Sequence, residues 1–240
     1  MTKTNSKDIT KVIGILLLCF VGILPLSAKV DVKSLRVENL TNPLGVDTDQ
    51  PRFSWVTTSD EKDVRQTAYQ IIVSGDKGEL WNSGKVDSDE QLWIPYAGGK
   101  LKSGMQCSWK VKVFTNKGET AWSEPQRFGI GLLKENHWSG RWIGLERLMP
   151  GEQRGQYTRL AARYVRSEFK LDKPVQRAIA YVAGIGLHEL HVNGKTFDRE
   201  VLVPMPTDYR KTVLYNTYDI TSSLTDENCI GVVLGNGRLF

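Results

Sequence analysis

Apolar and polar residues alternate in short runs along most of this chain, and that alternation restricts the fold more than any other feature. In the run WKVKVF at positions 109–114, the tryptophan and both valines fall on one face of a strand and the lysines on the other. No stretch after residue 30 keeps the apolar period of an amphipathic helix. Turn signals such as Gly75–Gly78 separate the runs at intervals of about ten residues. The pattern predicts an all-β chain built from β-sandwiches.

The tryptophans mark a boundary between two modules. All seven lie between Trp55 and Trp142, and none follows. We therefore expect a first sandwich over residues 29–131, a linker over 132–160 and a second module over 161–240. The first segment has about the 100 residues that are usual for one sandwich.

The second module is expected to be an incomplete jelly roll. Its candidate strands are Arg166–Leu171, Arg177–Val182, Leu187–Asn193, Val213–Ile220 and Cys229–Leu234. A jelly roll closes with about eight strands, so at least one strand here should keep unpaired N–H and C=O groups. The run CIGVVL at 229–234 is apolar on both faces and lies near the chain end. We predict that it forms this open edge.

The first 28 residues have the order of a secretory signal peptide. Lys3, Lys7 and Lys11 precede the apolar run VIGILLLCFVGILPL, and the small residues Ser27 and Ala28 follow it. The run is shorter than the ~20 residues that a membrane-spanning helix needs. We predict cleavage near Ala28 and a secreted or periplasmic bacterial protein that meets the membrane only through this segment, during export. An uncleaved N-terminal anchor is the alternative.

The charge and the cysteines exclude several functions. The net charge is +5 at neutral pH, and part of it lies in the signal segment, so the remaining chain lacks the basic excess of a nucleic-acid binder. Cys19 also lies in that segment. Cys107 and Cys229 fall in different predicted modules, so a disulfide between them stays open but is not favoured. The cysteines do not have the spacing of a metal site.

Candidates for catalysis are few. The segment HELH at 188–191 resembles a zinc motif, but its histidines are three residues apart in a predicted strand and should point to opposite faces. Glu189, Asp208 and Asp219 are available as the two carboxyl groups of an inverting glycosidase, which stand about 6.5–9.5 Å apart. The simpler interpretation is a solvated loop for Asp208 and a turn cap for Asp219.

Sugar binding is a second hypothesis. Proteins hold sugars by stacking a ring face on Trp or Tyr and by placing amides or carboxylates at the hydroxyl groups. Asn193, Asp208, Tyr209 and Asn236 carry side chains of these kinds. The alternative is that they are ordinary loop and sandwich residues.

Part of the first module resembles a known fold. The segment Leu101–Gly104, the alternating strand that follows and the run Trp122–Pro125 are similar to a fibronectin type III-like module, a relative of the Ig fold. That module commonly has a tyrosine at its corner position, where this chain has Cys107. The resemblance implies the sandwich and a corner hydrogen bond that is lost or replaced.

A longer set of motifs resembles the N-terminal half of bacterial α-L-rhamnosidases and spans nearly all of residues 30–240. In order, the set is NPLGVD at 42–47, PRFSW at 51–55, YQI at 69–71, WSEP at 122–125, Trp138 with WIG at 142–144, ELHVNGK at 189–195, TDY at 207–209, Tyr215 with YDIT at 218–221 and GNG at 235–237. The resemblance implies β-sandwich modules that precede an (α/α)₆ catalytic barrel in much longer enzymes. The paired acids of those enzymes lie in the barrel, so no catalytic residue carries over to this chain.

From the resemblance we expect an exported, non-catalytic N-terminal part of such a glycoside hydrolase, which acts on rhamnose-containing glycans. The family motif Gly-Asn-Gly-Trp reads GNGR at 235–238 here, close to the last residue, Phe240, which suggests a truncated second module or a fragment. An independent exported carbohydrate-binding or adhesion module is the alternative. Some family members bind L-rhamnose in the second module with the help of calcium, the one cofactor that the resemblance suggests, with ligands that stay unknown.

Overall fold

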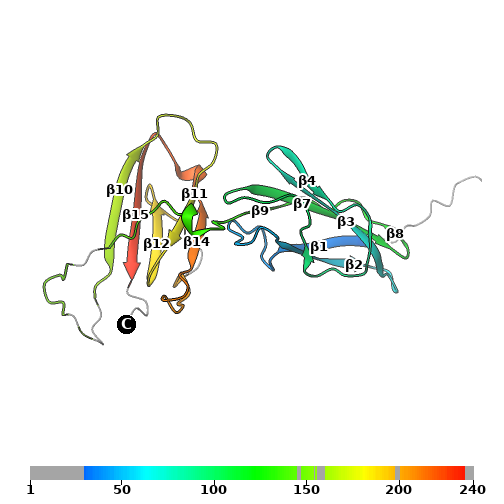
Figure 1. Ribbon diagram of the computed structural model, residues 1–240, viewed down its shortest axis with the longest axis horizontal. Helices are drawn as coiled ribbons and strands as arrows, with labels where there is room; N and C mark the ends of the chain where they lie inside the picture. Colours follow the sequence, from blue (N-terminus) through cyan, green and yellow to red (C-terminus); the bar gives the residue numbers. More distant parts are fainter. Residues whose placement is uncertain (1–29, 145–146, 154, 156–159, 198–200, 236–240) are drawn as a thin grey trace, which may run out of the picture.

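The computed structural model describes residues 30–144, 147–153, 155, 160–197 and 201–235. These residues are strands and loops with two short 3₁₀ helices, η1 (Glu135–His137) and η2 (Thr221–Ser223). No helix in this part of the chain is long and apolar enough to cross a membrane. The strands form two modules that lie end to end (Figure 1). The predicted all-β class and the β-sandwich architecture are therefore confirmed.

The first module has two antiparallel sheets. One has the order β1–β2–β6, and the other has the order β4–β3–β7–β8, with β5 also paired to β3 and β9 to β7. The strand bounds are β1 (Val30–Val37), β2 (Arg52–Ser59), β3 (Gln66–Gly75), β4 (Gly78–Asn82), β5 (Val86–Asp87), β6 (Ile94–Pro95), β7 (Gln106–Thr115), β8 (Gly118–Glu119) and β9 (Gln126–Gly129). In Figure 1, β1 and β2 form the lower layer of this module, and β3 and β7 form the upper layer.

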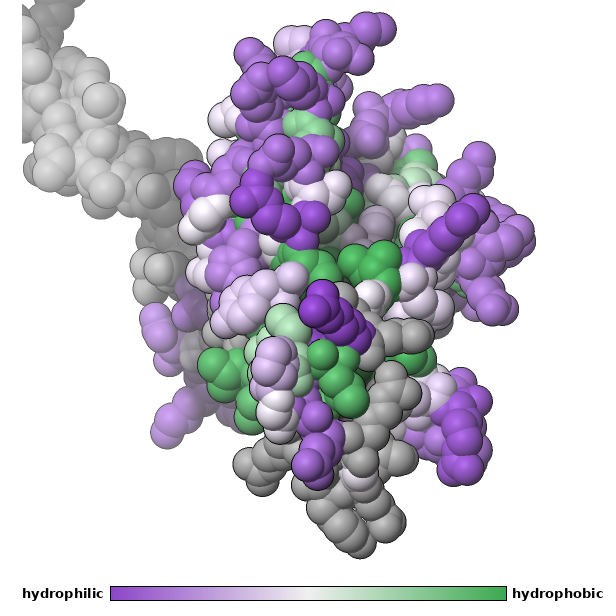
Figure 2. All heavy atoms as spheres, turned by 90° about the vertical axis from the view of Figure 1, so that its left-hand side faces the viewer, coloured by the Kyte–Doolittle hydropathy of each residue, from purple (hydrophilic) through white to green (hydrophobic). Residues whose placement is uncertain are grey.

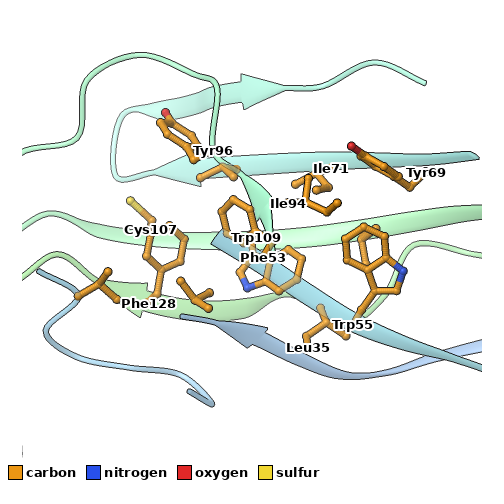
Figure 3. Close-up of a cluster of buried hydrophobic side chains, with 14 of the residues drawn as sticks. Leu35, Phe53, Trp55, Tyr69, Ile71, Ile94, Tyr96, Cys107, Trp109 and Phe128 are labelled. Atoms are coloured by element: carbon orange, nitrogen blue, oxygen red, sulfur yellow. The ribbon is translucent and has the colours of Figure 1, made fainter. Parts of the chain in front are cut away.

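Large aromatic rings fill the space between these two layers (Figure 3). The ring of Phe53 lies 4.6 Å from that of Trp109 and 5.8 Å from that of Phe128, measured between centroids. Trp55 and Ile71 are buried beside them. In β7 the tryptophan and both valines of the run at 109–114 are buried, which confirms the inward face predicted from the alternation.

Cys107 occupies the core where the related fold has its corner tyrosine. The residue is buried in the main cluster and forms no disulfide, and Cys229 is also a free thiol. Burial raises the pKa of the Cys107 thiol to about 11, so the thiol stays protonated at neutral pH. An apolar contact therefore replaces the usual tyrosine at this corner.

The second module pairs a four-stranded sheet, β10–β15–β12–β13, with a two-stranded sheet, β11–β14. The strand bounds are β10 (Arg163–Lys170), β11 (Ile179–Ala183), β12 (Leu187–Val192), β13 (Lys195–Thr196), β14 (Tyr215–Asp219) and β15 (Glu227–Gly235). Its core is small and centres on Leu190, Val192, Tyr218 and Ile220. Apolar side chains are visible among hydrophilic ones at this end of the molecule (Figure 2). The second module therefore buries fewer large apolar groups than the first.

The prediction that the run at 229–234 forms an open edge is wrong. Strand β15, which contains it, lies inside its sheet, antiparallel to β10 on one side and to β12 on the other. Both of its edges are thus hydrogen-bonded. The edge strand β10 of the same sheet instead carries exposed charged side chains.

Candidate functional site at the junction of the modules

Asn193, predicted to contact sugar, is used inside the fold. It lies in the turn between β12 and β13 with a φ of 50°. Its side-chain N–H groups donate to Ser223 O at 2.7 Å and to Asn228 Oδ1 at 2.9 Å, and its Oδ1 accepts the backbone N–H of Cys229 at 2.8 Å. These three bonds engage both ends of the amide and tie the turn to β15.

Asp208 and Tyr209 lie together, away from Asn193. The Asp208 carboxylate accepts from Arg210 Nε at 3.1 Å, and the Tyr209 hydroxyl accepts the backbone N–H of Gly186 at 3.2 Å. Gly186 precedes β12 and Asn193 follows it, so the two ends are about 20 Å apart at the usual strand rise. Asn236 lies outside the described residues. The structure therefore does not bring Asn193 to the same place as Tyr209.

Glu189 and Asp219, two of the three candidate carboxylates, are not arranged as a catalytic pair. Asp219 Oδ1 accepts the N–H of Thr221 at 3.0 Å and its hydroxyl at 2.6 Å, which is the turn cap that the sequence indicated. Glu189 lies on the other sheet and pairs with His191 at 2.6 Å. The two residues face outward from opposite sheets, which pack about 10 Å apart. Their carboxyl groups are thus farther apart than an inverting glycosidase requires.

The two histidines of the HELH segment point to opposite faces of β12, as predicted. His188 is buried, and its Nε2 lies 3.2 Å from the Tyr218 hydroxyl. His191 lies on the outward face beside Glu189. In the described part of the chain, no group of three or more His, Cys, Asp or Glu side chains is placed to hold a metal ion. The segment therefore lacks the shared face on which a zinc site depends.

The outward face of the β11–β14 sheet docks onto the first module, as Figure 1 shows. The Tyr215 hydroxyl accepts the backbone N–H of Leu132 at 3.0 Å, just after the first module. The Tyr215 ring also contacts the rings of Trp138 and Tyr181, with centroids 5.4 and 5.9 Å away. Burial raises the pKa of the Tyr215 hydroxyl, and Asp47 adds to the rise while the Leu132 N–H opposes it. The neutral hydroxyl thus anchors the linker to the second module.

Two glycines allow the close approach of the modules. A Cβ on Gly131 would lie 2.2 Å from the Tyr215 hydroxyl, and a Cβ on Gly45 would lie 2.3 Å from Thr217 Oγ1. Both distances are far below van der Waals contact. Gly45 belongs to the first module and Thr217 to β14 of the second, so this contact fixes how the modules sit against each other.

A cleft of about 680 Å³ opens beside this contact. The first module contributes Asp76 and Arg127 to its charged lining, and the second contributes Arg177 and Asp219; the remaining lining residues are Asn42, Pro43, Leu44, Ser74, Gly75, Gln106, Cys107, Ser108, Pro125, Gln126 and Phe128. The two acids and two bases balance in charge. Ligand sites often form between domains, and this cleft offers amide and charged groups to a polar ligand. Sequence reasoning missed it because its residues share no motif.

The fold and the junction thus define a pair of docked β-sandwich modules. Two families match them in order: "Rha78A-like, N-terminal immunoglobulin domain" over residues 32–134, and "Alpha-L-rhamnosidase N-terminal domain" over residues 173–239. In both modules, the chain is therefore similar to the N-terminal region of α-L-rhamnosidases.

Relatives and solved structures agree with this correspondence. An α-L-rhamnosidase of Formosa agariphila is 35% identical over 235 residues, which cover 88% of this chain and 25% of the relative, and one of Alteromonas sp. is 33% identical, covering 85% and 23%. The solved α-L-rhamnosidase of Dictyoglumus thermophilum is 39% identical, with a TM-score of 0.78 over 86% of this chain and 25% of that one. The Aspergillus terreus enzyme is 26% identical, with a TM-score of 0.75 over 87% and 24%. The chain thus spans about a quarter of the relatives that it matches.

Proposed function

We propose that this chain is the exported, non-catalytic N-terminal part of an α-L-rhamnosidase-like glycoside hydrolase that acts on rhamnose-containing glycans. The ordered match of both modules to the start of such enzymes carries the proposal. The separation of Glu189 from Asp219 adds support, because hydrolysis with inversion needs two carboxyl groups that flank one bond. The catalytic acids would therefore lie in a different part of the enzyme.

In this proposal the two modules act as one rigid support. The Tyr215–Leu132 hydrogen bond and the close contact of Gly45 with Thr217 hold the second module in one orientation. A fixed orientation keeps a neighbouring domain at a constant position relative to a bound polymer. The outward residues Asp208 and Tyr209 stay candidate sugar contacts at the end of the second module, and Asn236 stays a third.

The DNA that follows codon 240 tests the assignment to a longer enzyme. A continuing frame that encodes a helical barrel with paired acidic residues is the expected result. A stop codon directly after Phe240, in a genome verified by resequencing, would instead favour the second candidate, an independent carbohydrate-binding or adhesion module. The polar cleft between the modules is the observation in favour of that candidate.

Export is the remaining part of the proposal. Mass spectrometry of the protein recovered outside the cytoplasm should give an N-terminus close to Lys29, because the small residues Ser27 and Ala28 fit a signal peptidase site. An exported protein that keeps Met1 would contradict cleavage and favour the uncleaved anchor.

A further inference from the structure

Trp93 is held in an uncommon backbone conformation at the surface of the first module. Its φ is 59°, in the left-handed region that bulky residues rarely adopt. Its backbone N–H donates to the hydroxyl of buried Ser54 at 3.0 Å, and 43% of the residue is exposed. Strain of this kind lowers stability and clusters at functional sites. An exposed indole that is retained at such a cost calls for a reason other than core packing.

The Trp93 ring packs against the guanidinium of Arg52, which an ion pair with Glu38 holds in place. The Arg52 guanidinium lies 4.3 Å from the centroid of the Trp93 ring. Both oxygens of Glu38 accept from that guanidinium, the shortest contact being 2.6 Å, and Glu38 Oε1 also accepts the backbone N–H of Arg52 at 2.7 Å. The hydrogen bonds from Arg52 lower the pKa of the Glu38 carboxyl, so the pair stays charged. The indole is therefore preorganised, with little freedom to lose on binding.

A second arginine lies in the same row of the sheet. Arg36 of β1 is paired in register with Ser54 of β2, and Ser54 in turn accepts the N–H of Trp93. Neighbouring strands are about 4.8 Å apart, so Arg36 and Trp93 are two strand spacings apart, on the scale of one to two sugar rings. Arg36 is exposed and donates to Asn39 O at 3.4 Å, which leaves most of its five N–H donors for a ligand.

Several basic side chains are exposed on this outer face near Trp93. Lys33, Arg36 and Arg52 are exposed there, and Arg52 neutralises Glu38. Another acid, Asp31, is in register with Thr58, four residues along β2 from Ser54, which is about 13 Å at the strand rise. The exposed Asp89 and Glu90 precede Trp93 in the chain by four and three residues. The positive charge offered to a ligand with negative groups therefore comes from Lys33 and Arg36 on this face.

We propose that Trp93 and Arg36 form a surface site for an acidic glycan, in which a sugar ring packs on the indole and a uronate carboxylate pairs with the Arg36 guanidinium. The inference rests on the proposed function, since that enzyme would meet glycans. A sugar ring presents C–H groups to an aromatic face, and a guanidinium forms bidentate bonds to a carboxylate. The site would hold polymeric substrate away from the catalytic domain.

Affinity electrophoresis of the purified chain tests this site. The probes are a rhamnogalacturonan, whose chain alternates rhamnose and galacturonate, and the same polymer after carboxyl reduction. The test variants are Trp93→Asn and Arg36→Ala. Asn tolerates a left-handed backbone, so Trp93→Asn removes the ring without adding strain. Trp122→Ala is the matched control, because Lys110 lies over the Trp122 ring at 4.9 Å in a similar stack on the other sheet.

We expect the acidic polymer to retard the chain, Trp93→Asn to weaken this affinity at least tenfold, and Trp122→Ala to leave it unchanged. Arg36→Ala should weaken binding of the acidic polymer and not of the reduced one. Unchanged binding by Trp93→Asn, or no retardation of the parent chain, overturns the inference. The inference is also overturned if the chain forms a Trp93-dependent dimer in sedimentation and does not bind the polymer. That result would show that the face around Trp93 contacts a second copy of the protein. No hydrolysis is measured, so a negative result leaves the proposed function to its own test.

Discussion

Replacing Gly131 by alanine should weaken the docking of the two modules. The new Cβ would lie 2.2 Å from the Tyr215 hydroxyl and 3.3 Å from the carbonyl carbon of Gly45. The Tyr215 ring is held by Trp138 and Tyr181, so it can move only by breaking its bond to the Leu132 N–H. The lost hydrogen bond costs about 1 kcal/mol, and the forced methyl group costs about 1–3 kcal/mol more. The expected loss of stability is therefore at least about 2 kcal/mol.

Differential scanning calorimetry measures this loss. Unfolding temperatures shift by about 4–8 °C per kcal/mol for a module of 60–100 residues, so the transition of the second module should fall by at least about 8 °C while that of the first stays constant. Gly140→Ala is the control, because a Cβ there meets no atom within 4 Å. Tyr215→Phe should lower the same transition by removing the bond alone. If Gly131→Ala unfolds like Gly140→Ala, the modules are not held by this contact.

Two further predictions concern the cores of the modules. Burial raises the pKa of the Cys107 thiol from 9.0 to about 11, so the unfolded thiol loses its proton first. The contribution of this thiol to stability should be constant below pH 9 and fall by about 2–3 kcal/mol as the pH rises to 11. Denaturant melts of Cys107→Ala over this range should show a shallower fall, and an equal slope would contradict the burial of this thiol. In hydrogen exchange, the amides of 229–234 should be protected as strongly as those of 109–114, because β15 is paired on both edges; rapid exchange would restore the open-edge interpretation.

Local patterns in the sequence predicted the strands better than their order in space. The run at 109–114 gave both the strand and its buried face, because alternation and burial are properties of neighbouring residues. The run at 229–234 was also identified as a strand, but its position was not. Which strands flank β15 depends on residues 38 to 71 positions earlier, in β10 and β12, and no local pattern records that pairing.

The candidate sites also divide into local features, which the sequence indicated, and contacts between distant residues, which it did not. Asn193 precedes Gly194, and this pair is a turn signal, so its amide was better explained by the fold than by sugar binding. The junction could not be predicted, because Gly131 and Tyr215 are far apart in sequence and each resembles an ordinary turn or strand residue. Trp93 was equally hidden, since a left-handed φ at a tryptophan has no sequence signature.

An assay for rhamnosidase activity in the purified chain is the most direct test of the proposal that it is a non-catalytic N-terminal region. The purified chain, incubated with an aryl α-L-rhamnoside, should release no rhamnose above a buffer blank, because Glu189 and Asp219 lie on opposite sheets and each candidate carboxylate is engaged by a neighbouring residue. Activity that survives extensive purification and disappears on substitution of Glu189, Asp208 or Asp219 would contradict the assignment.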